Sequence, residues 1–239
     1  MAERGVPRLH SLIAGLRNGL IVSCQALENE PLYGSGTMAL MASAAEEGGA
    51  VAIRANTPQD IRAIKRKTSL PVIGLYKVRY PGSEAFITPT IREVREIREA
   101  GADLIAIDAT RQIRPDGESL EAFVAEIRLR FPDVVLVADV STFEEGAAAM
   151  EWGAEAVSTT LSGYTSYSPR QEHPDVELVS RLAALRHAPV LAEGRIWSPE
   201  QCQICLDAGA HAVVVGTAIT RPQEITRRFV KSIRAGCGK

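Results

Sequence analysis

Lys77 is the residue of this sequence whose position best suits acid–base chemistry. It directly follows the apolar, β-rich run Pro71–Tyr76, which has the length of a buried strand. A lysine at the carboxyl end of such a strand has its ammonium close to low-dielectric walls, and desolvation lowers the pKa of an ammonium group. Lys77 is therefore a candidate general base. The alternative interpretation is a strand-end lysine that points into solvent.

A repeat indicates which elements position this lysine. In four copies, a helix-like segment ends at a glycine followed by alanine, and a short apolar strand comes next. The glycines of these copies are Gly49, Gly101, Gly153 and Gly209. We expect each of them to end its helix in the left-handed conformation.

One further strand precedes the first copy and one lies between each pair of copies, which gives eight strands. These additional strands are Gly19–Cys24, Val72–Tyr76, Val134–Ala138 and Val190–Ala192. They alternate with amphipathic segments at Thr37–Glu47, Pro58–Lys67, Pro89–Ala100, Leu120–Phe131, Phe143–Trp152, Asp175–His187, Pro199–Ala208 and Pro222–Ala235. Four of these segments have a proline in the predicted first turn, at Thr57-Pro58, Thr88-Pro89, Ser198-Pro199 and Arg221-Pro222.

The pattern predicts an α/β protein with a single (β/α)8 TIM barrel. Apolar parallel strands need helices on their outer face, and closure into a barrel removes the edges of the sheet. We expect one domain over residues 1–239, with an N-terminal segment at 1–18 and the barrel core at 19–235. An open, doubly wound sheet is the alternative. The last helix carries Ile225, Phe229, Val230 and Ile233, which we expect to close the barrel against the first strands.

Chemistry in such a barrel takes place at the carboxyl ends of the strands. Polar residues follow every apolar run on that side, whereas the helix-capping side carries almost no ionisable residue. The residues at the carboxyl ends are Ser23, Cys24, Gln25, Arg54, Lys77, Arg79, Asp108, Thr110, Asp139, Ser141, Thr159, Thr160, Glu193, Gly194, Arg195, Gly216 and Thr217. Phosphate frequently binds after the last two strands of such barrels. Gly194, Arg195, Gly216 and Thr217 are therefore the candidate phosphate-binding residues, although tight turns would use glycine as well.

Several other partners are disfavoured. No histidine is predicted at the carboxyl end of a strand, and Asp108 with Asp139 would make a poor metal site, so no metal is expected. The formal net charge of −2 and the scattered basic residues give no support to nucleic-acid binding. The sequence shows no signal peptide and no membrane span, and we expect its four cysteines, Cys24, Cys202, Cys205 and Cys237, to be free thiols. A cytoplasmic location without a membrane partner is the resulting expectation.

The segment 162–172 follows the sixth strand and is rich in glycine, serine and tyrosine. It is expected to form either a mobile flap over the site, with Tyr164 near the substrate, or an ordinary surface loop.

These residues resemble the N-acetylmannosamine-6-phosphate 2-epimerase family of sialic acid catabolism. The resemblance runs from Gly19 to about Phe229. The stretches that carry it are Ile21–Ala26, Ala52–Arg54, Gly74–Lys77, Ala138–Thr142, Thr159–Thr165, Ala192–Arg195 and Val215–Ile219. The stretches around Lys77 and at Thr159–Thr165 are the most specific of these.

The resemblance implies a cofactor-free isomerase that converts N-acetylmannosamine 6-phosphate to N-acetylglucosamine 6-phosphate in N-acetylneuraminate degradation. It also implies that Lys77 is the essential base and that Glu193 lies close to the reacting carbon. The candidate substrate-binding residues are Gln25, Arg54, Asp139, Thr159 and Tyr164. The partner is then a small sugar phosphate, and a homodimer is possible through any apolar face that the last helix leaves uncovered.

Epimerisation at C2 requires an open sugar chain, because the C2 proton is acidic only beside the aldehyde. A base removes this proton to give an enolate, and a proton returns on the opposite face. Lys77 must be neutral to act as this base; Arg54 and Arg79 would lower its pKa and Glu193 would raise it. Two other readings remain open: a lyase in which Lys77 forms a Schiff base, and a non-catalytic phosphosugar-binding barrel.

Overall fold

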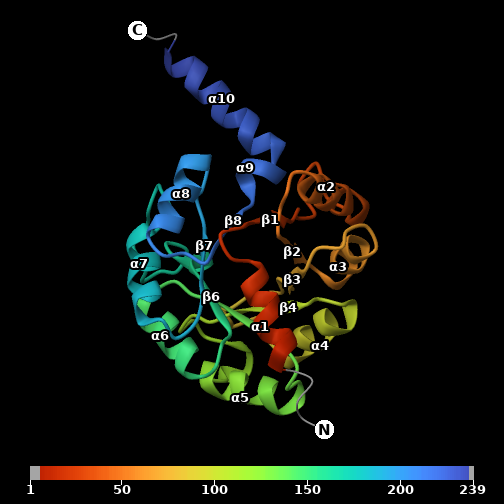
Figure 1. Ribbon diagram of the computed structural model, residues 1–239, viewed down its shortest axis with the longest axis vertical. Coiled ribbons are helices and arrows are strands. Elements are labelled where there is room, and N and C mark those ends of the chain that lie inside the picture. The colour runs from red at the N-terminus through yellow and green to blue at the C-terminus, as the bar shows by residue number, and fades with distance from the viewer. Residues whose placement is uncertain (1–5, 237–239) are drawn as a thin grey trace.

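The polypeptide folds into a closed barrel of eight parallel strands in sequence order, with β8 paired to β1 (Figure 1). The computed structural model describes residues 6–236. The strands are β1 Leu20–Cys24, β2 Ala52–Asn56, β3 Val72–Leu75, β4 Leu104–Asp108, β5 Leu136–Asp139, β6 Ala156–Ser158, β7 Val190–Glu193 and β8 Ala212–Val215. The (β/α)8 barrel predicted from the glycine repeat is confirmed.

Helices surround the barrel and connect its strands. They are α1 Val6–Gly15, α2 Ser35–Glu47, α3 Pro58–Lys65, α4 Ile91–Ala100, α5 Leu120–Arg130, α6 Phe143–Glu151, α7 Val176–Leu185, α8 Pro199–Asp207, α9 Thr217–Thr220 and α10 Pro222–Gly236, with 3-10 turns η1 Pro115–Gly117 and η2 Thr159–Leu161. Three of the predicted proline starts are confirmed, at α3, α8 and α10. The start at Pro89 was wrong: α4 begins at Ile91, because Thr90 and Glu93 form a capping box there.

The four glycines of the repeat end their helices as predicted. Their φ angles are 90° at Gly49, 95° at Gly101, 92° at Gly153 and 103° at Gly209. These values lie in the left-handed region, which glycine enters without the steric cost that a Cβ atom brings. Each glycine thus turns the chain from a helix into the next strand.

Two apolar layers stabilise the barrel. Strand residues that point inward, such as Ile73 and Leu191, form the inner layer, while the outer layer lies between strands and helices. Helix α1 belongs to the inner layer, since Ile13 and the adjacent Leu16 pack with these inward residues. His211 at the start of β8 contacts the Ile13 carbonyl through Nε2 at 2.7 Å. The amino-terminal end of the barrel is therefore covered, and the polar residues lie at the carboxyl end.

Helix α10 does not close the barrel, in contrast to the prediction. It projects away from the strands in Figure 1, and none of its residues is buried. Phe229 is 67% exposed and Ile233 is 64% exposed. Arg221 leaves the helical conformation after α9, and Pro222 starts a new helix in another direction. The apolar face expected from the sequence exists, but the barrel of its own chain does not cover it.

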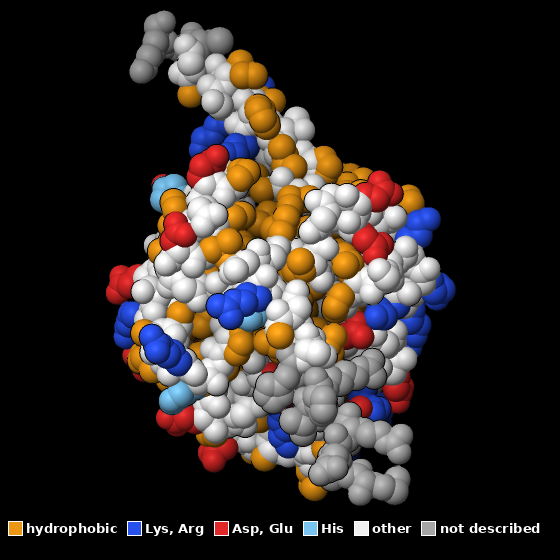
Figure 2. Space-filling model, in the orientation of Figure 1, with side chains coloured by type: hydrophobic (Ala, Val, Ile, Leu, Met, Phe, Trp, Pro, Cys, Tyr) orange, Lys and Arg blue, Asp and Glu red, His pale blue; other side chains and the backbone are white. Residues whose placement is uncertain are grey.

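An apolar groove lies beside the base of α10, on the outside of the barrel. It has a volume of about 440 Å³ and runs along β1, β8 and α8. Its apolar lining includes Leu20, Ile196, Trp197, Pro199, Cys202, Leu206, Val213, Val215, Ala218 and Ile219. Figure 2 shows hydrophobic side chains gathered below the projecting helix. A helix normally covers this part of a (β/α)8 barrel, so the groove is the place that α10 leaves empty.

The cysteines are thiols where the structure describes them. Cys24, Cys202 and Cys205 form no disulfide, as predicted, and Cys237 lies outside the described residues. Burial raises the pKa of the Cys24 thiol to about 12. Within residues 6–236, every helix is too short or too polar to cross a lipid bilayer.

Candidate active site

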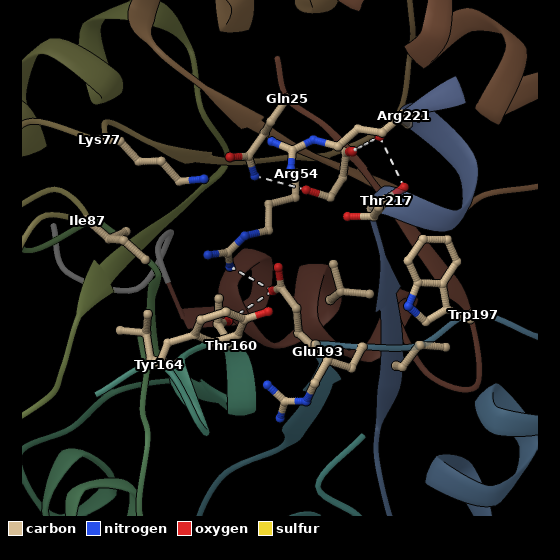
Figure 3. Close-up of a pocket in the computed structure, with 18 of the residues that line it drawn as sticks. Gln25, Arg54, Lys77, Ile87, Thr160, Tyr164, Glu193, Trp197, Thr217 and Arg221 are labelled. Carbon is tan, nitrogen blue, oxygen red and sulfur yellow. Dashed lines mark hydrogen bonds and ion pairs between the residues drawn. The ribbon is translucent and has the colours of Figure 1, made fainter. Parts of the chain in front are cut away.

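A polar cavity of about 370 Å³ opens at the carboxyl end of the barrel (Figure 3). Side chains that follow β1, β2, β3, β6, β7 and β8 converge on it. The lining residues are Ser23, Gln25, Arg54, Lys77, Phe86, Ile87, Thr160, Leu161, Tyr164, Glu193, Gly194, Arg195, Ile196, Trp197, Val214, Gly216, Thr217, Thr220 and Arg221.

Lys77 extends from the end of β3 toward the middle of this cavity (Figure 3). Its backbone N–H donates to Asn56 Oδ1 at 2.9 Å, and the residue forms a short antiparallel bridge with Ile87. Burial lowers the pKa of the Lys77 ammonium to about 8; Arg54 and Arg221 lower it as well, against the opposing effect of Glu193 and Asp139. About a tenth of Lys77 is therefore neutral at pH 7, far more than for a lysine with an ordinary pKa.

Arg54 lies beneath the cavity floor and is only 1% exposed. Its Nη2 donates to Asp139 Oδ2 on β5, and its Nη1 lies 3.4 Å from Glu193 Oε2. Within the described part of the chain, Nε and Nη1 of this guanidinium have no hydrogen-bond partner. Arg54 is thus a buried cation between two carboxyl groups with donor capacity left over.

Glu193 ends β7 and faces Arg54 across the cavity floor (Figure 3). Its Oε2 lies 3.0 Å from Thr160 Oγ1 and 3.3 Å from Ser158 Oγ. Burial is the main cause that raises the pKa of the Glu193 carboxyl; the Asp139 carboxylate adds to it, and Arg54 acts in the opposite direction.

Arg221 brings a second cation to the cavity from the junction of α9 and α10. Its Nη2 pairs with Glu30 Oε2 at 3.0 Å. The sequence reasoning missed this residue because Arg221-Pro222 was interpreted only as a helix start. Its place shortly after the glycine at the end of β8 was the signal that could have revealed it.

Comparisons with known proteins agree on one family. A family model described as "Putative N-acetylmannosamine-6-phosphate epimerase" matches residues 38–235. A protein of Caldanaerobacter subterraneus subsp. tengcongensis, named "Putative N-acetylmannosamine-6-phosphate 2-epimerase", is 57% identical over 223 residues, 93% of this chain and 94% of that protein. A protein of the same name from Enterobacter sp. (strain 638) is 51% identical and covers 92% of this chain and 94% of its own length. The chain belongs to this family.

A solved structure of the N-acetylmannosamine-6-phosphate 2-epimerase from Clostridium perfringens agrees with this assignment. It is 47% identical in sequence to this chain and superimposes with a TM-score of 0.88. The match covers 92% of this chain and 95% of the other. The epimerase-family resemblance predicted from the motifs is therefore confirmed, and the fold is shared along almost the whole length.

The cavity brings together most of the substrate-binding residues expected for this epimerase family. Gln25, Arg54 and Tyr164 line it, and Gln25 donates through Nε2 to Ser23 Oγ at 2.9 Å. Asp139 is fully buried below the cavity, where it binds Arg54. Thr159 is also buried: its hydroxyl contacts the backbone N–H and C=O of Glu193, whereas the adjacent Thr160 lines the cavity.

The four candidate phosphate-binding residues all line the cavity. Gly194 has a φ of 112° and Arg195 a φ of 57°. The Arg195 guanidinium donates to the carbonyls of Ser162 at 2.7 Å and His173 at 3.0 Å. This arginine therefore holds the loop after β6. Of its three guanidinium nitrogens, Nη2 is buried and has no hydrogen-bond partner within residues 6–236.

The loop 162–172 has an internal hydrogen-bond network. Ser168 Oγ accepts from the Gly163 N–H at 2.9 Å and lies 2.7 Å from Thr165 Oγ1. Tyr164 is 63% exposed and stacks with Arg195 at the cavity mouth. Tyr164 therefore places this loop beside the cavity mouth, and whether the loop is a mobile flap or an ordinary surface loop stays a prediction.

Two charged residues at the carboxyl ends of strands face elsewhere. The Arg79 guanidinium lies 4.8 Å from the centre of the Phe86 ring. The Asp108 carboxylate accepts from the Phe86 N–H and from Thr110. Both residues support the loop after β3, beside the cavity.

Proposed function

We propose that this chain interconverts N-acetylmannosamine 6-phosphate and N-acetylglucosamine 6-phosphate by removing and returning the C2 proton. The observation that carries the proposal is the Lys77 amine, which lies in the cavity with its pKa lowered to about 8. A base of this pKa is partly neutral at physiological pH and still strong enough to take a proton beside an aldehyde. Family membership supports this substrate class.

In the proposed reaction, the ring-opened sugar places C2 against the Lys77 amine. The amine takes the C2 proton, and negative charge develops on the aldehyde oxygen of the enolate. The Arg54 guanidinium, with two nitrogens that have no hydrogen-bond partner within the described residues, would stabilise this charge in a site shielded from water. Return of a proton to the opposite face of C2 gives the epimer. Glu193, on the other side of Arg54, is the second catalytic candidate.

The phosphate would bind on the β7–β8 side of the cavity, where Gly194, Gly216 and Thr217 lie. Arg221 provides a cation on that side, and Arg195 adds the free Nη2 of its guanidinium. Gly216 packs tightly against β1, because an added Cβ would lie only 3.2 Å from the Ser23 Cβ.

The test is proton NMR of N-acetylmannosamine 6-phosphate with the protein in deuterated water, which reports product and C2 exchange together. We expect the wild-type chain to form the epimer with deuterium at C2. Lys77→Ala should slow exchange by at least about a thousandfold. Lys67→Ala removes an exposed lysine and serves as the matched control. Undiminished exchange in Lys77→Ala would refute the assignment, and borohydride trapping of substrate on Lys77 would favour the lyase instead.

We further propose that the chain forms a homodimer through α10. The apolar face of this helix, with Phe229 and Ile233, is exposed, and the groove between α8 and β1 lacks a covering helix. The helix projects away from the strands and helices of its own barrel, as Figure 1 shows. A second copy supplies a helix with an exposed apolar face, so reciprocal packing would cover both apolar surfaces at once.

We also propose a cytoplasmic location. Cys24, Cys202 and Cys205 are thiols, and two of them are buried in the apolar layers around the barrel. A reducing compartment preserves such thiols, whereas oxidising compartments favour disulfides.

A further inference from the structure

Four oxygen atoms form a connected cluster under the cavity floor: Asp139 Oδ1, Thr160 Oγ1, Ser158 Oγ and Glu193 Oε2. Thr160 Oγ1 is the centre, at 2.7 Å from Asp139 Oδ1, 2.8 Å from Ser158 Oγ and 3.0 Å from Glu193 Oε2. The remaining contact, between Ser158 and Glu193, is longer at 3.3 Å. Asp139 and Ser158 are fully buried, whereas Thr160 and Glu193 line the cavity.

The number of protons in this cluster decides how it can be bonded. Three short contacts meet at Thr160, and each requires one proton between its two oxygens. The two hydroxyl groups supply two protons. If both carboxyl groups were ionised, one short contact would place two oxygens together without a proton. A third proton, on Glu193, completes the set: Thr160 donates to Asp139, while Glu193 and Ser158 donate to Thr160.

The charged groups around the cluster also bear on whether the third proton lies on Glu193 or on Asp139. Arg54 donates to Asp139 through Nη2, which keeps that carboxylate ionised. Its Nη1 lies 3.4 Å from Glu193 and makes no hydrogen bond to it. Asp139 repels a second negative charge, and burial disfavours an ionised Glu193. Arg54 and, more weakly, Lys77 act in the opposite direction and lower the pKa of Glu193, but burial is the largest effect and the pKa is raised.

We infer that Thr160, with Ser158, is a positioning residue that holds Glu193 in its protonated form and directs the Glu193 O–H at Thr160 Oγ1. Figure 3 shows Thr160 beside Glu193, with a dashed line between their side chains. The catalytic meaning of this inference rests on the proposed function, whereas the protonation state itself does not.

The consequence concerns Lys77. Lys77 and Glu193 together can carry one proton in two ways: an ammonium with a carboxylate, or an amine with a carboxylic acid. With the Thr160 proton directed at Asp139 and the Ser158 proton directed at Thr160, the cluster stabilises the second arrangement. It then offers the Glu193 proton an acceptor, and leaves a Glu193 carboxylate only the longer contact of 3.3 Å with Ser158. The cations Arg54 and Arg221 then lower the pKa of Lys77, and of the two carboxyl groups only Asp139 still raises it. Lys77 therefore stays a neutral amine at lower pH values than it would beside an ionised Glu193.

The experiment is carbon-13 NMR of ligand-free protein labelled at the glutamate carboxyl carbon, titrated with pH. The signal missing from Glu193→Gln assigns residue 193. We expect this signal at the position of a protonated acid at pH 7. In Thr160→Val the pKa of Glu193 should fall, because the acceptor for its proton is gone, and Thr160→Ser should restore the wild-type titration.

The opposite bonding, in which Thr160 donates to an ionised Glu193, makes the opposite prediction. Thr160→Val would then raise the pKa of Glu193, and the wild-type signal would be that of a carboxylate. Either result would overturn the inference. The wild-type titration decides the question even if Thr160→Val does not fold. None of these measurements needs substrate, so their outcome is independent of the proposed reaction.

Kinetics provides the second readout. With Glu193 ionised, the pKa of Lys77 rises, and the acid limb of the kcat/KM profile should move to higher pH. We expect Thr160→Val to lose about tenfold in kcat/KM at pH 6 and about twofold or less at pH 9, with Thr160→Ser close to wild type. An equal loss at both pH values would indicate a merely structural role and contradict the inference.

Discussion

Lys77 carries an ammonium group into the barrel, where burial and the Arg54 guanidinium lower its pKa from 10.5 to about 8. A group that is easier to deprotonate in the folded state makes folding less favourable while it is charged. The resulting loss in the free energy of unfolding has its full size below pH 8, where the lysine is protonated in both the folded and the unfolded state. It disappears above pH 10.5, where the amine is neutral in both.

Lys77→Met should therefore stabilise the protein while it abolishes activity. At pH 7 we expect a gain of about 3 kcal/mol in the free energy of unfolding, which is the difference in pKa converted to energy. Urea denaturation at pH 7 and at pH 10.5 measures it, and the gain should vanish at the higher pH. Lys67→Met is the control, with no change expected at its exposed site. Equal stability of wild type and Lys77→Met at pH 7 would contradict the prediction.

The sequence was sufficient to place Lys77 and Glu193 at the cavity, because each directly follows an apolar run and the carboxyl ends of parallel strands meet. It was not sufficient to choose between Thr159 and Thr160. Strand β6 ends at Ser158, and the 3-10 turn η2 follows at once. The alternation of a strand no longer applies in such a turn, so the second threonine lines the cavity and the first one is buried.

At the level of elements, the contact of β3 with its helices depends on Gly74. An added Cβ at this position would lie 2.5 Å from Ile97 Cγ2 and 2.8 Å from Ile61 Cδ1. Helices α3 and α4 therefore approach β3 more closely than any larger residue permits. This approach sets the position of β3 at Gly74, three residues before Lys77.

Gly74→Ala should destabilise the protein by about 1–3 kcal/mol, because the core must shift to accept the methyl group. Gly36→Ala is the matched change: it lies within α2 with no atom near the added Cβ, and it should stabilise by about 0.5–1 kcal/mol. Thermal unfolding followed by circular dichroism compares the two. An unchanged melting temperature in Gly74→Ala would show that the helices move apart without cost.

At the level of the whole molecule, α10 shows where pattern reasoning stops. The spacing of Ile225, Phe229 and Ile233 predicts an apolar face, and that face exists. Periodicity indicates that the apolar face of a helix packs against another surface. It does not indicate whether that surface belongs to the same chain or to a second copy. The direction of α10 depends on the backbone at Arg221 and Pro222, which the pattern does not encode.

A charged variant tests the assembly proposed for this helix. Phe229→Glu with Ile233→Glu places two carboxylates on the apolar face and should convert a dimer into monomers in sedimentation or light-scattering experiments. Thr226→Glu with Lys231→Glu changes exposed positions on the same helix and is the control. A wild-type chain that is monomeric at micromolar concentration would contradict the proposal.

Arg221 connects these scales, since it lines the cavity and directly precedes Pro222, the first residue of α10. If α10 is anchored on a second copy, the backbone that carries this arginine is fixed by a neighbour instead of by its own barrel. Turnover per molecule would then depend on how concentrated the protein is: dilution would free the helix, loosen the phosphate-side cation and lower specific activity. In that case, the total epimerase activity in a cell would rise more than linearly with the concentration of the protein.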